Sequence, residues 1–80
     1  MNFQTKLRNS FENVAPYITN LDTIASLIQL LTNEVDSLRT CMTVLEKKMG
    51  SADTTLRTDI QILINEIQHV LRLEERSSVR

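Results

Sequence analysis

Apolar residues recur along the middle of the chain at alternating spacings of three and four. From Leu21 onward the series has no gap: Leu21, Ile24, Ile28, Leu31, Val35, Leu38, Met42, Leu45 and Met49. This spacing is a heptad repeat, and it predicts an amphipathic helix that packs along other helices. Tyr17 extends the series by one turn. We call the whole series, with the continuation described below, the seam.

A shorter apolar pattern precedes the seam in segment 1–15. Phe3, Leu7 and Val14 lie at helical spacing, and Ser10 is the polar member of the stripe. Pro16 follows; it lacks an N–H and clashes with a preceding carbonyl in a continuous helix. The sequence therefore predicts a kink or a fresh helix start near Pro16, where Asn13 could cap the new helix.

Residues 50–53 are the one predicted interruption after the main segment, 16–49. Gly50 could end a helix and Ser51 or Asp53 could cap the next, which gives a helical hairpin. In the alternative, the helix continues and the repeat contains one four-residue stutter. We favour a continuous, bent rod over the hairpin, because a single four-residue insertion in the repeat is enough to explain the spacing.

The seam continues through a second helical segment, 54–76. Its members there are Leu56, Ile60, Leu63, Ile67 and Val70. Ile62 and Leu73 are three helical turns apart and form a secondary face that a further chain could cover. The tail, 77–80, loses the periodicity and is predicted to fray. A straight helix over residues 17–76 would be about 90 Å long, so it must bury its stripe against other chains or against itself.

The predicted fold is therefore all-α: a long amphipathic helix that forms a coiled coil. Branched Ile28 and Val35 at one core position, with Leu31 and Leu38 at the other, favour a parallel pair. Extra apolar residues beside the N-terminal part of the seam widen the stripe, which suits three or more helices. Strand number and direction stay open.

Composition narrows the class of protein. The chain has 80 residues, a net charge of −1, one Gly, one Pro and no Trp. No basic patch indicates nucleic acid, and no apolar run is long enough for membrane insertion. A single cysteine suits a reducing compartment. We expect an intracellular protein, in the cytoplasm, the nucleus or inside a virus particle, and not a secreted one.

Few residues indicate site chemistry. His69 has no second ligand at metal-binding spacing, so a surface histidine is the expected role. Cys41 lies beside the seam, where it is either a small apolar filler or one half of an interchain disulfide. We expect no enzyme, no metal and no cofactor, because neither a catalytic constellation nor a phosphate loop is present.

Two groups of residues occur in the same order as in a known family. They are Val35-Asp36-Ser37, Thr40 and Leu45-Glu46, then Thr58-Asp59-Ile60, Ile64, Glu66-Ile67-Gln68 and Leu71. In these residues, under half its length, the chain resembles the small fibrous proteins of baculoviruses, which form coiled-coil filaments. The resemblance implies self-assembly into filaments. The N-terminal segment with Pro16 is extra, and the family's proline-bearing linker and basic tail have no counterpart here.

A second resemblance covers residues 22–50. In the placement of apolar residues, and in Asp22, Val35, Thr43, Glu46 and Gly50, this stretch is similar to the cappuccino-type subunit of the complexes that build lysosome-related organelles. From these features we mainly expect a non-enzymatic structural protein that self-associates through its coiled coil. Such a protein could be a structural component of a virus. The alternative is an obligate subunit of a hetero-oligomeric adaptor or tethering complex, bound to other helical chains through the seam.

Overall fold

The computed structural model describes the backbone of residues 2–78 and the side chains of residues 2–74. Within that part every regular element is helical. The elements are α1 (Phe3–Val14), a 3-10 turn η1 (Ala15–Tyr17), α2 (Leu21–Glu34), α3 (Leu38–Met49) and α4 (Thr54–Ser78). The predicted all-α class is confirmed.

Three helices begin at side chains that satisfy a first-turn amide. Asn2, Ser37 and Asp53 each accept a hydrogen bond from the backbone N–H three residues later, at 2.8, 3.1 and 2.8 Å. Such caps replace the partner that a first-turn amide lacks. Asp53 was one of the two caps considered for the second helical segment.

The chain changes direction at Pro16. Helix α1 ends at Val14, the 3-10 turn contains Pro16 in its first turn, and α2 begins only at Leu21. The suggestion that Asn13 caps the new helix is wrong. Asn13 lies inside α1, and its side-chain amide donates to Glu66 of α4 at 3.1 Å.

The single helix expected over residues 16–49 is corrected to two shorter helices. The backbone leaves helical angles at Val35, with φ −124° and ψ 163°, and Ser37 then caps α3. The heptad spacing continues across this connector, Val35–Ser37. Periodicity places apolar residues on one face, but it does not by itself require the backbone between them to stay helical.

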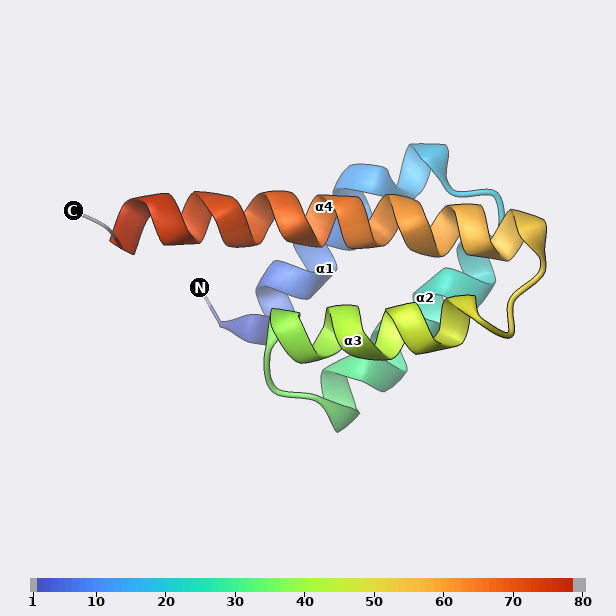
Figure 1. Cartoon of the computed structure of the whole chain (residues 1–80), viewed down its shortest axis with the longest axis horizontal. Helices are drawn as coiled ribbons and strands as arrows, with labels where there is room; N and C mark the ends of the chain where they lie inside the picture. The colour runs from blue at the N-terminus through green and yellow to red at the C-terminus, as the bar shows by residue number, and fades with distance from the viewer. Residues whose placement is uncertain (1, 79–80) are drawn as a thin grey trace.

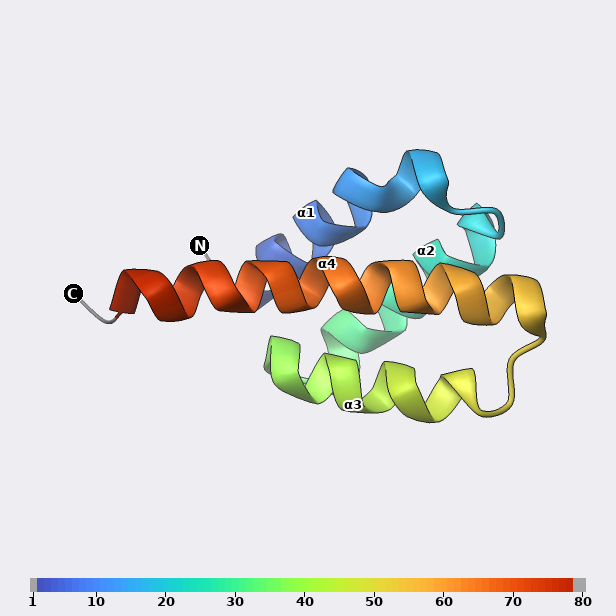
Figure 2. The same ribbon diagram turned by 45° about the horizontal axis from the view of Figure 1, so that its top comes forward.

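The chain reverses at Gly50–Asp53, so the rod favoured from the stutter is also corrected. Helices α3 and α4 run antiparallel, side by side (Figures 1 and 2). The longest dimension is 41 Å, against about 90 Å for the straight helix. Residues 77 and 78, expected in the frayed tail, belong to α4. Residues 79–80 of that tail, and Met1 of segment 1–15, lie outside the described residues.

Helix α4 is the centre of the arrangement. It packs between α3 and α1, and α2 packs against α1 (Figures 1 and 2). The core between them is formed by Leu7, Val14, Ile18, Ile24, Ile28, Leu31, Leu38, Cys41, Leu45, Ile60, Leu63, Ile64 and Ile67. The radius of gyration, 12.2 Å, is near the value of about 12 Å for a folded domain of this length. The stripe is therefore buried against the chain itself.

Candidate partner-binding groove

Eight of the fifteen seam residues are buried inside this one chain. They are Ile24, Ile28, Leu31, Leu38, Leu45, Ile60, Leu63 and Ile67. We expected them to contact other chains, whereas here they contact one another across the four helices. Binding through them would require the fold to open.

The other seam residues are more accessible. Val35, Met42, Met49, Leu56 and Val70 are partly buried at the edge of the core. Tyr17 and Leu21, at the junction of η1 and α2, are 71% and 45% exposed. The secondary face is divided, since Ile62 packs partly against the core and Leu73 is exposed.

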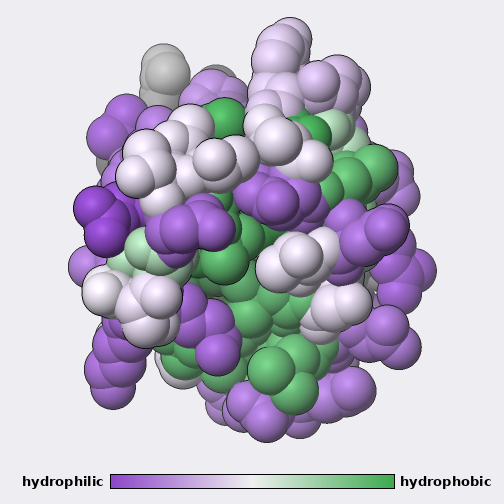
Figure 3. Space-filling view, turned by 90° about the vertical axis from the view of Figure 1, so that its right-hand side faces the viewer, coloured by the Kyte–Doolittle hydropathy of each residue, from purple (hydrophilic) through white to green (hydrophobic). Residues whose placement is uncertain are grey.

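An apolar groove lies at the end of the molecule where the α3–α4 turn meets α2. It encloses about 360 Å³ and is lined by Thr23, Ser26, Leu27, Leu30, Lys48, Ser51, Ala52, Leu56 and Ile60. Figure 3 faces this end and shows apolar side chains exposed in a hollow between polar ones. Leu30 is the most accessible of the leucines in the groove, at 42% exposure. We call these nine residues the groove.

Among the polar residues of the groove, one carries a charge. Three hydroxyl side chains stand beside the leucines, and Lys48 is the single ionisable residue in the lining. An apolar floor with one cation favours a ligand with an apolar face and a nearby carboxylate. The nine residues of the lining include no carboxylate, imidazole or thiol.

Asp59 positions the groove by joining α4 to the start of α2. Its carboxylate accepts hydrogen bonds from the backbone N–H of Thr19 at 2.9 Å and of Asn20 at 2.8 Å, and from the Asn20 side-chain amide at 2.9 Å. The side chain is only 1% exposed. We call this arrangement the Asp59 clamp. It holds the first turn of α2 against α4, next to Ile60 in the groove.

The clamp also changes the acidity of its carboxyl group. Burial raises the pKa of Asp59, and the hydrogen bonds from Thr19 and Asn20 lower it; the net effect is a pKa below the ordinary value. Hydrogen bonds to the charged form outweigh the loss of hydration. The carboxylate is therefore ionised at neutral pH.

Sequence reasoning missed the role of Asp59, which entered only through the fibrous-protein resemblance. A signal was present: Asp59 is three residues after Leu56 and four before Leu63, so it lies on the apolar face of its helix. A carboxylate there predicts a partner, because an unpaired buried charge is costly. Leu30 was missed as well, since it lies outside the heptad positions.

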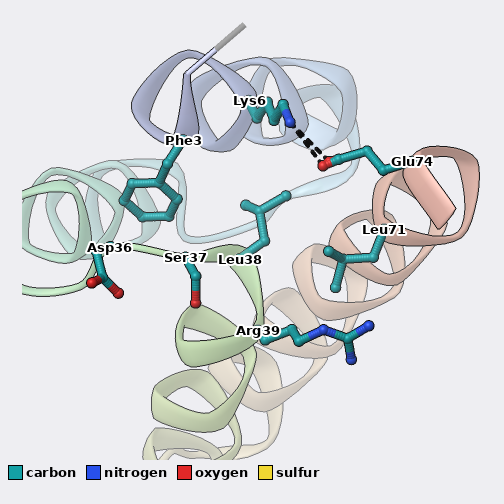
Figure 4. A pocket seen from close by; sticks show the side chains of 8 residues that line it. All are labelled: Phe3, Lys6, Asp36, Ser37, Leu38, Arg39, Leu71 and Glu74. Carbon is teal, nitrogen blue, oxygen red and sulfur yellow. Dashed lines mark hydrogen bonds and ion pairs between the residues drawn. The ribbon is translucent and has the colours of Figure 1, made fainter. Parts of the chain in front are cut away.

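A second cavity, of about 280 Å³, lies at the opposite end of α4. Phe3, Lys6, Asp36, Ser37, Leu38, Arg39, Leu71 and Glu74 line it. The Lys6 ammonium pairs there with both carboxylate oxygens of Glu74, at 2.8 and 2.9 Å (Figure 4). Its lining is more polar than that of the groove, and this ion pair joins α1 to α4.

The chain's single cysteine and single histidine lie in different surroundings. Cys41 is fully buried in the core, and burial raises the pKa of its thiol to about 11. It is a small core residue of α3 and stays protonated at neutral pH. His69 is exposed. No group of three metal-ligating side chains occurs among the described residues, and no helix in that part is long and apolar enough to cross a membrane.

Comparison of the chain with protein-family models finds no match, and comparisons with curated proteins and with solved structures find none either.

Proposed function

We propose that this protein is a non-enzymatic interaction module that binds the apolar face of an amphipathic helix of another protein in its groove. The observation that supports the proposal is the groove itself, an apolar hollow in which Leu30 is 42% exposed while its neighbour Leu31 is completely buried. Recognition of a helix in a groove uses apolar anchors at helical spacing. This function corresponds to the adaptor-subunit alternative.

The proposed partner helix has a defined chemistry. Its anchors are Leu or Ile residues spaced one turn apart, which fill the space above Leu27, Leu30 and Leu56. A Glu or Asp at the edge of its apolar face pairs with Lys48. The charge pair sets orientation more than affinity, because it lies at the rim.

The test uses a designed probe: a helical peptide of about 16 residues with Leu at i, i+4 and i+7 and a Glu beside them. Titration into ¹⁵N-labelled protein should shift the amide resonances of Leu27, Leu30 and Ala52. A matched peptide with Lys in place of Glu should bind more weakly. Shifts that avoid the groove would overturn the proposal.

Two leucine variants make the test specific. Leu30→Glu removes a groove contact, and it should weaken peptide binding by about tenfold or more, because a buried leucine contributes roughly 1.5–3 kcal/mol. Leu73→Glu is the matched control, since Leu73 is a similarly exposed leucine of α4 outside the groove. Equal affinities of the two variants would exclude the groove as the binding site.

A second candidate function is self-association into a structural assembly within a cell or a virus particle. The heptad repeat, unbroken in sequence across the α2–α3 connector, favours it, and the resemblance to baculovirus fibrous proteins supports it. A coiled coil between copies belongs to this proposal. Light scattering after size exclusion tests it, because a self-assembling chain shows a mass that rises with concentration.

A further inference from the structure

The connector Val35–Ser37 differs from an ordinary interhelical turn. It contains neither Gly nor Pro, the residues that usually terminate helices. The spacing from Leu31 to Val35 to Leu38 is four and three, so the heptad register passes through it without a shift. A straight helix from Leu21 to Met49 would keep all nine seam residues on one stripe, over about 44 Å.

Local hydrogen bonds and the partial packing of Val35 against the core hold the connector in its bent form. The backbone N–H of Val35 still donates to the carbonyl of Leu31 at 3.0 Å, as in a continuing helix. The backbone N–H of Cys41 donates to the carbonyl of Ser37, also at 3.0 Å. Between them, the Ser37 side chain caps α3 by accepting from Thr40. Straightening the connector would exchange this cap for about five helical backbone hydrogen bonds.

The surroundings of the connector leave it room to move. Asp36 and Ser37 line the 280 Å³ cavity together with Phe3 and Leu71. Figure 4 shows the connector at the edge of this space, with the Lys6–Glu74 pair across it. At the connector itself Val35 packs only partly against the core, and the closest contacts between helices lie on either side of it, in α1–α2 and α3–α4.

We propose that the connector Val35–Ser37 is a hinge, and that two copies of the chain exchange their α3–α4 hairpins by straightening it into one helix from Leu21 to Met49. Every contact that the hairpin makes with α1 and α2 in one chain is then made with the same residues of the second copy. Exchange of identical elements is a low-cost route to a dimer, because only the hinge changes. The inference is independent of peptide binding in the groove.

The exchange makes a specific prediction about the Lys6–Glu74 pair. In the monomer both residues belong to one chain, whereas in the exchanged dimer Lys6 of one copy meets Glu74 of the other. A carbodiimide joins an amine directly to a carboxylate in contact with it, with loss of water, so this pair at 2.8 Å can be linked covalently. The linked peptide reports which chains contribute.

The experiment mixes equal amounts of ¹⁴N- and ¹⁵N-labelled chains, unfolded together and refolded at high concentration. Monomer and dimer are separated by size exclusion with light scattering, cross-linked and analysed by mass spectrometry. In the dimer, about half of the Lys6–Glu74 cross-links should join chains of different isotope. A dimer with only same-isotope cross-links is a side-by-side dimer, and it would overturn the proposal.

A variant in the hinge provides a second test of the exchange. Ser37→Ala removes the cap that only the bent form uses, which is worth a factor of about five in each monomer. Two caps are lost for each dimer, so the association constant should rise about 25-fold. Asn2→Ala is the matched control: it removes the equivalent cap of α1, which both forms keep, and it should leave the association constant unchanged.

A third variant should act in the opposite direction. Two glycines inserted between Asp36 and Ser37 lengthen the hinge and disfavour the straight helix, so this variant should stay monomeric at every concentration. Circular dichroism confirms that each variant is folded. The proposal fails if wild type and Ser37→Ala are both monomeric at millimolar concentration, or if Asn2→Ala dimerises as strongly as Ser37→Ala.

Discussion

Leu30 and Leu31 are neighbours in α2, and they show how differently the chain uses its two apolar regions. Leu31 belongs to the seam and is completely buried, whereas Leu30 belongs to the groove and is 42% exposed. The two residues have the same side chain and lie in the same helix. The difference is that Leu31 points into the core between the helices, while no described residue covers Leu30 completely. The packing of neighbouring helices, and not the type of side chain, therefore decides whether a leucine belongs to the core or to the candidate binding surface.

The largest expected effect is in the seam. Leu31→Asp places a charge in the centre of the core and should cost more than about 4 kcal/mol. A domain of this size has about 3–5 kcal/mol of stability, so the variant should be unfolded by far-UV circular dichroism at 25 °C. Cooperative unfolding close to that of wild type would contradict the assignment of Leu31 to the core.

The Asp59 clamp, which connects the two regions, should give the next largest effect. Asp59→Ala removes three hydrogen bonds to a carboxylate and leaves the backbone amides of Thr19 and Asn20 without this acceptor. We expect a loss of about 2–4 kcal/mol in urea unfolding. Asp53→Ala, which removes an exposed cap of the same helix, should cost only about 1 kcal/mol. Similar losses for the two variants would show that the clamp is no more than an ordinary cap.

The clamp also predicts a dependence of stability on pH. The pKa of Asp59 is lower in the folded protein than in the unfolded chain, where it is about 3.9. Its contribution is therefore fully present above that unfolded value and is lost as the pH falls through the folded pKa. Urea midpoints between about pH 6 and pH 2.5 should fall more steeply for wild type than for Asp59→Asn. Parallel curves would show that other carboxylates cause the acid sensitivity.

The smallest effect on stability is expected in the groove. Leu30→Asp should change the free energy of unfolding by less than about 1 kcal/mol, because the side chain is already partly in water. Urea unfolding of this variant beside Leu31→Asp sharpens the comparison between adjacent residues. A loss as large as that of Leu31→Asp would mean that the groove is part of the core.

Local chemistry explains two of the helix boundaries, although a continuous helix was favoured across Gly50–Asp53. Pro16 separates α1 from α2, and Asp53 caps α4 after Gly50, since a missing N–H and a capping carboxylate act within one turn of helix. The break at Val35–Ser37 was not predicted. It lies inside a perfect heptad repeat, where the bent connector and a straight helix place the same apolar residues on one stripe.

The candidate site was predicted only in part. Leu56 and Ile60 were among the seam residues expected to bind a partner, and they line the groove. Leu30 and Lys48, which give the groove its accessible apolar surface and its charge, were not. A heptad pattern identifies residues that will be buried; it carries no information on which of them the chain covers by itself.

The sequence by itself determined that this protein is helical, that its apolar residues recur at helical spacing, and that Pro16 disfavours a continuous helix; it left open whether the chain reverses at Gly50–Asp53. These properties follow from periodicity, proline and capping, which act over a few residues. The tertiary structure decided that the stripe is buried within one chain, that Asp59 holds α2 to α4, and that Leu30 faces a groove. Those outcomes depend on contacts between residues far apart in the chain, where the packing of four short helices sets which surfaces meet.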